Sequence, residues 1–204
     1  SYEVAALGAG GRNGVLIASR HGLSEVQESI ADYAPKNHDE ALPDLLSEPR
    51  LISAVCGGLR VASVYAPNGR EVDAPHFHAK LHWYGALRAW SAERITESAP
   101  LLLGGDFNVA PTDADVWDPA ALVGATHVTP RERDAWNALV GLGLMDAAQA
   151  VVADGDRAPF TWWDYRGGAF HRGWGMRIDH LLVEPRAGSI VTSNVDREGR
   201  KGES

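Results

Sequence analysis

Residues 101–108 read LLLGGDFN, an apolar run that ends in two glycines followed by Asp106 and Asn108. The three leucines predict a buried strand, and the glycines let another group approach the backbone closely where that strand ends. Asp106 and Asn108 are two positions apart, so their side chains project to the same side if the chain stays extended. The stretch therefore predicts a strand that delivers a polar pair to one edge of a sheet.

This polar pair has two interpretations. In the first, the carboxylate of Asp106 is a base or a metal ligand, and the amide of Asn108 is a neutral hydrogen-bond donor beside it. In the second, the two side chains form an Asx turn that closes the strand. The stretch alone leaves both interpretations open.

Strands and helices alternate irregularly along the rest of the chain. Apolar residues recur at helical spacing over residues 74–95, and Thr129, Pro130 and Glu132 form a capping box that begins a helix over residues 130–140. Several strands joined by tight turns favour a mixed α/β architecture with packed sheets over a purely parallel sheet. The expected strands are residues 15–18, 51–55, 59–65, 101–103 and 177–183, the first of them after the glycine-rich turn GAGGRNG.

The length of 204 residues, with 45% hydrophobic and 23% charged residues, is typical of one globular domain with a well-buried core. Every apolar run is far shorter than a membrane-spanning helix, so no membrane partner is expected. A single cysteine, Cys56, excludes an internal disulfide, and no basic-then-apolar leader opens the sequence. These features predict a cytoplasmic protein.

The net charge of −8 argues against a protein that coats nucleic acid through bulk electrostatics. Residues 157–186 differ, because five arginines stand against three acidic residues there. Within this segment, residues 160–168 read FTWWDYRGG, with bulky rings at both odd and even positions. A core strand would bury only alternate side chains, so some of these rings are expected to serve a surface outside the core.

The stretch RIDHLLV at residues 177–183 contains a second candidate carboxylate. Asp179 shares a strand face with Leu181 and Val183, so it is expected to be partly buried and to need a partner. That partner is either the ring N–H of a catalytic histidine or the guanidinium of Arg177 or of another arginine.

Tyr65 ends its predicted strand just before the turn Ala-Pro-Asn-Gly. Its phenol is either a donor to an oxyanion or part of a half-buried packing residue. By contrast, Asp113, Asp115 and Asp118 lack the glycine and the terminal glutamate of a calcium loop, so they predict a polar loop.

Six stretches together resemble the exonuclease III/AP endonuclease family, in the order in which that family carries them. The element G-D-x-N alone would indicate only the broader endonuclease/exonuclease/phosphatase superfamily. The element F-x-W-x-D-Y-R followed by R-I-D narrows the resemblance to DNA repair nucleases. The stretches are NGVLIASR, RVASVYAPNG, FHAKLHWYGAL, LLLGGDFNVAPTDADVWDP, FTWWDYRGGAF and RIDHLLV, and together they cover nearly the whole chain.

This resemblance implies an α/β fold, a four-layer sandwich of two packed mixed β-sheets flanked by helices, of the deoxyribonuclease-I-like type. Residues 1–204 would form a single domain of this kind. The resemblance also implies that Asp106 positions and deprotonates the attacking water, that Asn108 holds a phosphate oxygen, and that Tyr65 stabilises the pentavalent phosphate. Asp179 would orient a catalytic histidine.

The resemblance further implies a metal cofactor and a DNA substrate. The cofactor would be magnesium, or manganese in its place, with Asp106 and Asn108 as ligands. The aromatic stretch would contact an abasic deoxyribose and the neighbouring bases, and Arg166 would meet the DNA backbone. The expected aromatic contacts are Trp162, Phe160 and Trp163.

Two family elements would lie beyond the ends of this sequence: an N-terminal segment with a metal-binding glutamate, and a C-terminal S-D-H motif. We therefore expect the domain to be incomplete at both ends, and Asp106 and Asn108 alone to bind magnesium weakly. His180 is a poor substitute for the family's histidine, because it follows Asp179 directly and points to the opposite face.

The leading hypothesis is a DNA repair nuclease that hydrolyses phosphodiester bonds of duplex DNA at abasic sites and at 3′ ends, and that is a monomer when complete. One alternative is a non-catalytic DNA-binding remnant that keeps the aromatic and arginine surface. Another is a phosphoesterase of the same superfamily with a small substrate, which would not need the wide aromatic platform of FTWWDYR.

Overall fold

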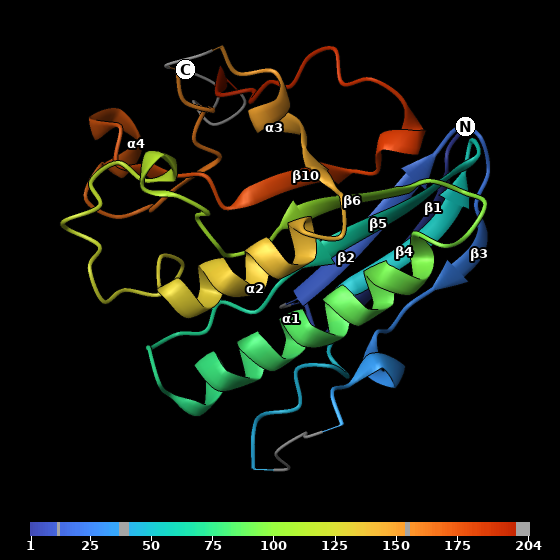
Figure 1. The fold of residues 1–204 in the computed structure, drawn as a ribbon, viewed down its shortest axis with the longest axis horizontal. Coiled ribbons are helices and arrows are strands. Elements are labelled where there is room, and N and C mark those ends of the chain that lie inside the picture. Colours follow the sequence, from blue (N-terminus) through green and yellow to red (C-terminus); the bar gives the residue numbers. More distant parts are fainter. Residues whose placement is uncertain (12, 37–40, 154–155, 199–204) are drawn as a thin grey trace.

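A six-stranded mixed sheet forms the centre of the computed structural model, which describes residues 1–11, 13–36, 41–153 and 156–198 (Figure 1). The strand order is β3-β4-β5-β6-β10-β7, and β5 and β6 are the parallel pair among antiparallel neighbours. The strands are β3 (Ser24–Gln27), β4 (Leu51–Cys56), β5 (Leu59–Tyr65), β6 (Leu101–Asp106), β7 (Met145–Asp146) and β10 (Asp179–Val183).

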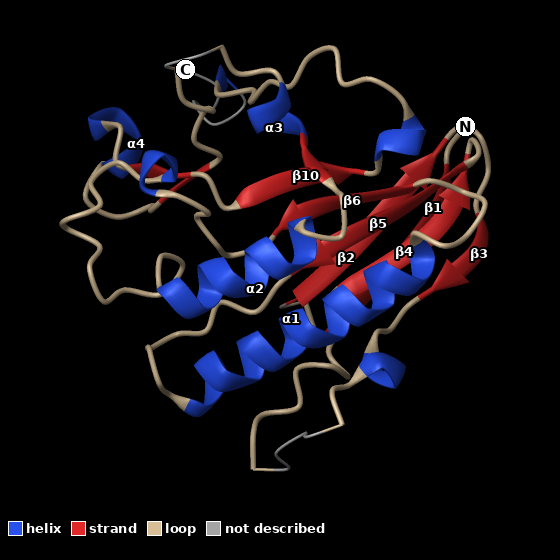
Figure 2. Cartoon of the chain, viewed as in Figure 1, coloured by secondary structure: helices blue, strands red, loops and turns tan. Residues whose placement is uncertain are grey.

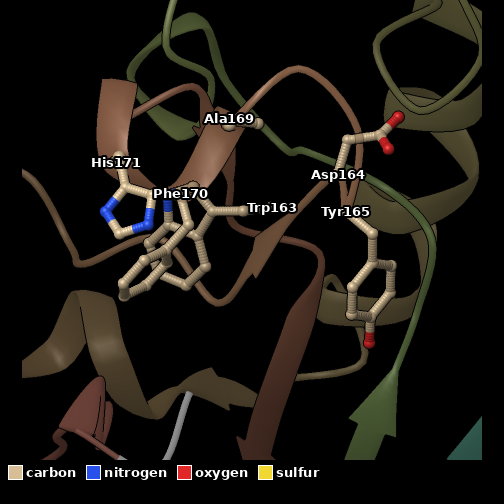
Figure 3. A pocket seen from close by; sticks show the side chains of 7 residues that line it. Trp163, Asp164, Tyr165, Ala169, Phe170 and His171 are labelled. Atoms are coloured by element: carbon tan, nitrogen blue, oxygen red, sulfur yellow. The ribbon is translucent and has the colours of Figure 1, made fainter. Parts of the chain in front are cut away.

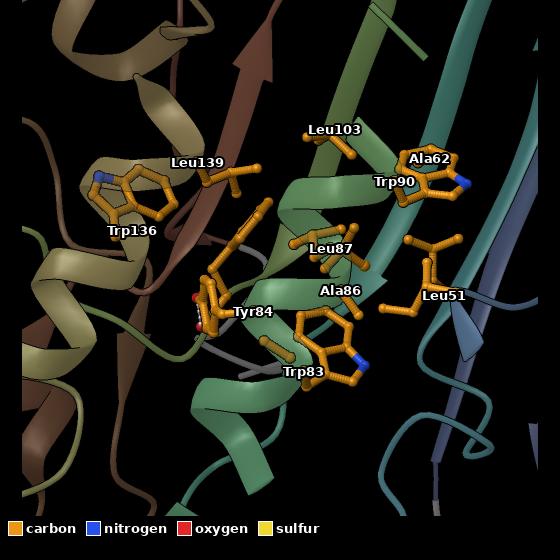
Figure 4. Packing of buried hydrophobic residues seen from close by; sticks show 14 of the residues in the cluster. Leu51, Ala62, Trp83, Tyr84, Ala86, Leu87, Trp90, Leu103, Trp136 and Leu139 are labelled. Atoms are coloured by element: carbon orange, nitrogen blue, oxygen red, sulfur yellow. Dashed lines mark hydrogen bonds between the residues drawn. The ribbon is translucent and has the colours of Figure 1, made fainter. Parts of the chain in front are cut away.

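Two long helices, α1 (Pro75–Arg94) and α2 (Pro130–Val140), lie side by side across one face of this sheet (Figure 2). Apolar side chains from both helices and from the sheet form the main core between them (Figure 4). Trp83, Leu87 and Trp90 of α1 are almost completely buried there. The capping box of Thr129 and Glu132 begins α2 as the sequence predicts.

A hairpin covers the other face of the sheet. It consists of β1 (Glu3–Ala9) and β2 (Asn13–Ser19), which pair antiparallel. Val15 and Ile17 of β2 pack against Ile52 and Ala54 of β4 in a second apolar cluster. The predicted α/β class with packed sheets is therefore confirmed, and in the described part of the chain this hairpin represents the second sheet.

A small lobe with its own apolar cluster stands beside the sheet. Its two short strands, β8 (Trp162–Trp163) and β9 (Gly175–Met176), pair with each other, and a bridge joins Met176 to Val116. The short helix α4 (Ala169–Arg172) lies between the two strands in sequence, and another short helix, α3 (Ala147–Ala150), follows β7. Phe160 and Trp163 form the centre of the cluster in this lobe.

The last strand starts two residues later than the sequence predicts. The backbone N–H of Arg177 donates to the carbonyl oxygen of Asp115 instead of joining the sheet. The guanidinium of Arg177 is almost fully buried and pairs with the carboxylates of Asp115 and Asp146, each at 2.6 Å. The prediction of a simple polar loop is therefore wrong for Asp115, whose side chain is 1% exposed.

No helix in the described ranges is both long and apolar enough to cross a membrane.

Candidate active site

Three of the predicted site residues lie in a row across neighbouring strands. Tyr65 at the end of β5 pairs with Asp106 at the end of β6, and Asp179 at the start of β10 pairs with Asp106 from the other side. Side chains of directly paired residues lie on the same face of a sheet. The register therefore places the phenol and the two carboxylates together at one end of the sheet.

Gly105 is required for this arrangement. Its φ of +143° is a conformation that side chains with a Cβ rarely adopt. A Cβ at this position would lie 1.9 Å from the carbonyl oxygen of Val64 on the neighbouring strand, which is a severe clash. The second glycine of LLLGGDFN thus brings β5 and β6 close together immediately before Asp106.

Asn108 holds the carboxylate of Asp106 by two hydrogen bonds. Its backbone N–H donates to one carboxylate oxygen at 2.8 Å, and its side-chain amide donates to the other at 2.9 Å. The same amide group also donates to the carbonyl oxygen of Ala66 at 2.9 Å. The contact from the backbone N–H has the geometry of the predicted Asx turn, so the turn and the polar pair are both present.

The environment of Asp106 raises the pKa of its carboxyl group to about 7. Burial is the largest cause, and the neighbouring carboxylate of Asp179 adds to it. The hydrogen bonds from Asn108 and the charge of Lys80 act in the opposite direction without outweighing these effects. A carboxyl group with this pKa can accept a proton from water at neutral pH, as a general base must.

Two further residues belong to the site, Asn68 and His127. The side-chain amide of Asn68 donates to the side-chain oxygen of Asn108 at 3.2 Å. The Nδ1 atom of His127 lies 2.7 Å from the carbonyl oxygen of Asn108. Because a carbonyl only accepts, Nδ1 carries the ring proton, and Nε2 is left as an acceptor 3.5 Å from the Asn68 amide nitrogen.

Burial lowers the pKa of His127 to about 4, and the charge of Lys80 acts in the same direction. The imidazole is therefore neutral at physiological pH. Neither Asn68 nor His127 is singled out by the sequence. Asn68 lies in the Ala-Pro-Asn-Gly turn and could have been suggested by its place just after Tyr65, whereas His127 lies in a long loop and carries no signal.

These residues line a pocket of about 650 Å³. Tyr65, Asp106 and Asn108 lie at its base, and side chains of the small lobe complete its wall. The lobe residues that line it are Trp162, Asp164, Tyr165, Arg166 and Met176. The pocket thus combines a polar base with a partly aromatic wall, as the resemblance implies for Trp162.

The aromatic stretch divides between core and surface. Phe160 and Trp163 are 8% and 2% exposed and pack in the cluster of the small lobe, which leaves their rings little free surface for the expected DNA contact. Tyr165, for which the sequence suggests no role, is 91% exposed. Tyr165 also borders a second pocket, where Figure 3 shows Trp163 and Phe170 on the opposite side.

Arg166 is at the surface beside the pocket, with its side chain 89% exposed. Its guanidinium forms two hydrogen bonds with the carboxylate of Asp164, at 3.1 and 2.9 Å. This pair is accessible to solvent, so the guanidinium can exchange the carboxylate for a phosphate at low cost.

Asp179 is half-buried, and its carboxylate does not pair with Arg177 as one sequence interpretation suggested. The hydroxyl oxygen of Thr161 accepts from the backbone N–H groups of Ile178 and Asp179, which fixes the start of β10. His180 is buried on the opposite face, as predicted, where its Nε2 lies 2.9 Å from the carbonyl oxygen of Val109.

The donor atoms at this end of the sheet suit a hard divalent cation. Two carboxylates, Asp106 and Asp179, are adjacent, and their mutual repulsion helps to raise the pKa of Asp106. A cation beside them would offset that repulsion, and carboxylate and amide oxygens are the ligands that Mg²⁺ and Mn²⁺ prefer. The set is small, because the described residues include no group of three or more His, Cys, Asp or Glu side chains placed to hold a metal.

Affinity for a divalent cation is expected to depend on pH through Asp106. Because only the deprotonated carboxyl binds metal and its pKa is about 7, protons compete at lower pH. We expect Mn²⁺ affinity to be nearly constant above about pH 8 and to fall about tenfold per pH unit below about pH 6. Isothermal titration calorimetry across this range measures it, with Asp113→Asn as a control carboxylate. An affinity that is flat across the range would contradict the assignment.

The model of the endonuclease/exonuclease/phosphatase family matches residues 2–200 of the chain. The exodeoxyribonuclease of Bacillus subtilis is 29% identical over 173 residues, which cover 85% of this chain and 64% of that protein. Exodeoxyribonuclease III of Haemophilus influenzae is 30% identical over 140 residues, which cover 64% of this chain and 51% of that protein. The chain thus spans only 64% and 51% of the length of these two relatives.

Several solved structures of nucleases and of a 3′ phosphatase are also similar to this chain. The 3′–5′ exonuclease NExo of Neisseria meningitidis has a TM-score of 0.85 and 36% identity, over 99% of this chain and 75% of that chain. The 3′ phosphatase NExo from Neisseria bound to a product DNA hairpin has a TM-score of 0.79 and 37% identity, over 91% and 67%. An AP endonuclease from Archaeoglobus fulgidus has a TM-score of 0.79 and 30% identity, also over 91% and 67%. The chain therefore belongs to the endonuclease/exonuclease/phosphatase family, and within it to the branch of exonuclease III and the AP endonucleases.

Proposed function

We propose that this chain carries the active site of a metal-dependent DNA repair nuclease that hydrolyses phosphoester bonds of duplex DNA at 3′ ends and at abasic sites. One observation carries the proposal: the register of β5, β6 and β10 aligns Tyr65, Asp106 and Asp179, and the first two of these line a pocket with an aromatic wall. Membership of the family indicates the class of reaction, and the residues that line the pocket indicate the kind of substrate.

Asp106 is the proposed general base. Its carboxylate can take a proton from the attacking water, and Asn108 fixes both of its oxygens. The amide hydrogens of Asn108 are engaged with Asp106 and Ala66, so its proposed role is to orient the base. Its side-chain oxygen is the atom that would face a metal.

Tyr65 is the proposed donor to the charged phosphoryl oxygens. It is next to Asp106 in register, and its ring lies under the guanidinium of Arg50 at 4.9 Å. A phenol stabilised in this way can donate to an oxygen whose negative charge grows in the transition state. Asp106, Asn108 and Asp179 would hold Mg²⁺ or Mn²⁺, which supplies Lewis acidity toward those same oxygens.

The small lobe would hold the DNA. Trp162 lines the same pocket as Asp106, and the exposed side chains of Tyr165 and Arg166 also border this pocket. A ring can stack on a sugar or base, and a guanidinium can bind a backbone phosphate, so the lobe offers both kinds of contact. We propose 3′ ends as the principal substrate, because the Neisseria structures that share 36% and 37% identity are a 3′–5′ exonuclease and a 3′ phosphatase.

One observation favours a second candidate, a chain that binds DNA without cleaving it. Among the described residues, no group of three metal-ligating carboxylates or imidazoles is assembled. Binding through rings and arginines would weaken with salt and would not require a metal, whereas hydrolysis requires the metal.

The experiment that tests the proposal uses labelled duplexes that carry either a 3′-phosphate, an unmodified recessed 3′ end or an internal abasic site. Each is incubated with the chain in Mg²⁺, in Mn²⁺ and in chelator. We expect metal-dependent product from the first two, with less from the abasic duplex. Binding of all three duplexes without any metal-dependent product would refute catalysis by this chain and support the second candidate. Hydrolysis of small phosphoesters alone would indicate a phosphoesterase.

A further inference from the structure

The segment that follows β6, residues 107–110, is held by side chains from four other parts of the fold. In a sheet or helix, backbone carbonyls are satisfied by backbone N–H groups, but here each carbonyl oxygen accepts from a side chain. The donors are Tyr84 to Phe107, Lys80 and His127 to Asn108, His180 to Val109, and Arg133 to Ala110. Asn108, whose side chain fixes Asp106, therefore lies in a cage of side-chain donors.

Lys80 is the charged member of this cage nearest to Asn108. Its ammonium lies 2.7 Å from the Asn108 carbonyl oxygen and 2.5 Å from a carboxylate oxygen of Glu132. Both side chains are 0% exposed. An ammonium and a carboxylate at that depth require each other, because either one alone would be an uncompensated buried charge.

Glu132 connects this ion pair to the opposite side of the cage. One of its carboxylate oxygens accepts from Lys80 and from the backbone N–H of His127 at 2.9 Å. The other accepts from the hydroxyl and the backbone N–H of Thr129 at the start of α2. The ion pair thus links α1, α2 and the loop that carries His127, and side chains of α1 and of this loop meet at the carbonyl of Asn108.

The backbone of Asn108 needs such support. Its φ is +53°, in the left-handed region, where non-glycine residues are uncommon and where an asparagine costs free energy relative to a glycine. This conformation turns the amide back toward Asp106 and Ala66. A change of φ at Asn108 would move the amide away from the carboxylate that it orients.

We infer that Lys80, with Glu132 as its counter-ion, is a positioning residue for the active site: its ammonium holds the Asn108 carbonyl, and through Asn108 it fixes the carboxylate of Asp106. This inference rests on the proposed function. It assigns a catalytic consequence to an ion pair that touches neither substrate nor metal.

An ion pair that only stabilises the fold would respond differently to substitution than one that positions Asn108. Replacing both members of a buried ion pair by neutral side chains of similar volume is often neutral or stabilising. If Lys80 and Glu132 only held the helices together, the neutral pair would therefore restore both stability and activity. If Lys80 positions Asn108, the neutral pair restores stability without restoring the rate.

The test compares Lys80→Met, Glu132→Gln and the double variant in the 3′-end assay. Methionine keeps the unbranched stem of Lys80, and glutamine keeps the acceptor for the His127 N–H. The matched control is Arg60→Met, which removes another buried cation, 2% exposed, paired with Glu97. In the strand register of β5 and β6, Arg60 lies opposite Leu101. This is the far end of the two strands from Tyr65 and Asp106.

We expect Lys80→Met to lower both Tm and kcat, with kcat reduced about thirtyfold and KM changed less than about threefold. The double variant is expected to recover Tm and to keep the low kcat. Arg60→Met is expected to lower Tm with kcat unchanged. Recovery of kcat together with Tm in the double variant would overturn the inference, as would an equal loss of kcat in Arg60→Met.

A measurement without catalysis separates this inference from the proposed function. The side-chain amide of Asn108 gives a pair of proton–nitrogen NMR signals, which its hydrogen bonds to Asp106 and Ala66 shift and protect from exchange. We expect those signals to move and to exchange faster in the double variant but not in Arg60→Met. Unchanged signals refute the positioning role, even if the wild-type chain cleaves DNA. Moved signals in a chain that cleaves nothing support the role and refute only the proposed function.

Discussion

Asp106→Asn is expected to reduce the rate of 3′-end hydrolysis by about 10³-fold while the chain stays folded. The asparagine keeps the size of the carboxylate and one acceptor for the Asn108 backbone N–H, but it cannot take a proton from water. Its amide also replaces the oxygen that accepts from the Asn108 side chain at 2.9 Å, so two donors would face each other. The loss is therefore expected mainly in kcat.

Single-turnover kinetics with a 3′-phosphate duplex measures this loss, and thermal unfolding checks that the variant is folded. Asp113→Asn is the control, since it makes the same chemical change at a carboxylate that is 70% exposed and pairs with Arg133. We expect that control to stay within about twofold of the wild type. A rate for Asp106→Asn above one tenth of the wild type would show that another group is the base.

Arg177→Met is expected to lower the free energy of unfolding by about 3–5 kcal/mol. The guanidinium is the partner of two carboxylates, Asp115 and Asp146, whose side chains are 1% and 11% exposed. Removing it leaves two carboxylates close together with little access to water, and either they stay charged at high cost or they take up protons. The same change removes a donor to His180 at 3.0 Å.

Denaturation with urea at pH 7 measures this difference. The control is Arg166→Met, which breaks the bidentate pair with Asp164 at the surface, and we expect it to change the free energy of unfolding far less, because water screens this pair. Both variants lose one arginine that binds carboxylate, so the contrast compares a buried cluster of two carboxylates with a single exposed pair. Equal losses in the two variants would contradict the interpretation that Arg177 is the buried centre of an ionic cluster.

The row of Tyr65, Asp106 and Asp179 is the part of the site that the sequence predicts. Each residue lies at the end of an apolar run, and polar residues at such ends meet at one edge when the strands pair. The run LLLGG also explains Gly105, because only a residue without a Cβ fits against the backbone of the next strand. Local pattern is sufficient here because strand pairing is itself a regular geometry.

Other parts of the site depend on contacts that are distant in sequence. Lys80 occupies a buried helix position that the apolar pattern does not mark, and its partner Glu132 is 52 residues away. Arg177 likewise reads as a strand residue until Asp115 and Asp146 are brought to it by the fold. Propensity and periodicity describe one segment at a time, so they give no indication of such pairs.

In the aromatic stretch FTWWDYRGG, the sequence pattern also does not determine which rings are buried and which are exposed. Rings at both odd and even positions predict a surface outside the core, and Trp162 and Tyr165 line the pocket. Phe160 and Trp163 are buried instead, because they pack with Ala169 in the apolar cluster of the small lobe. The assignment of each ring follows from the path of the backbone, which composition does not determine.

The small lobe around β8 and β9 is built separately from the row of catalytic residues. Its cluster of Phe160, Trp163 and Ala169 is distinct from the core beneath the helices. We therefore expect substitutions within this cluster to affect the lobe more than the strand register that positions Asp106. In evolutionary terms, the fold divides the proposed site between two parts: the sheet holds the proposed base, and the lobe, which carries the proposed DNA contacts, can diverge in sequence.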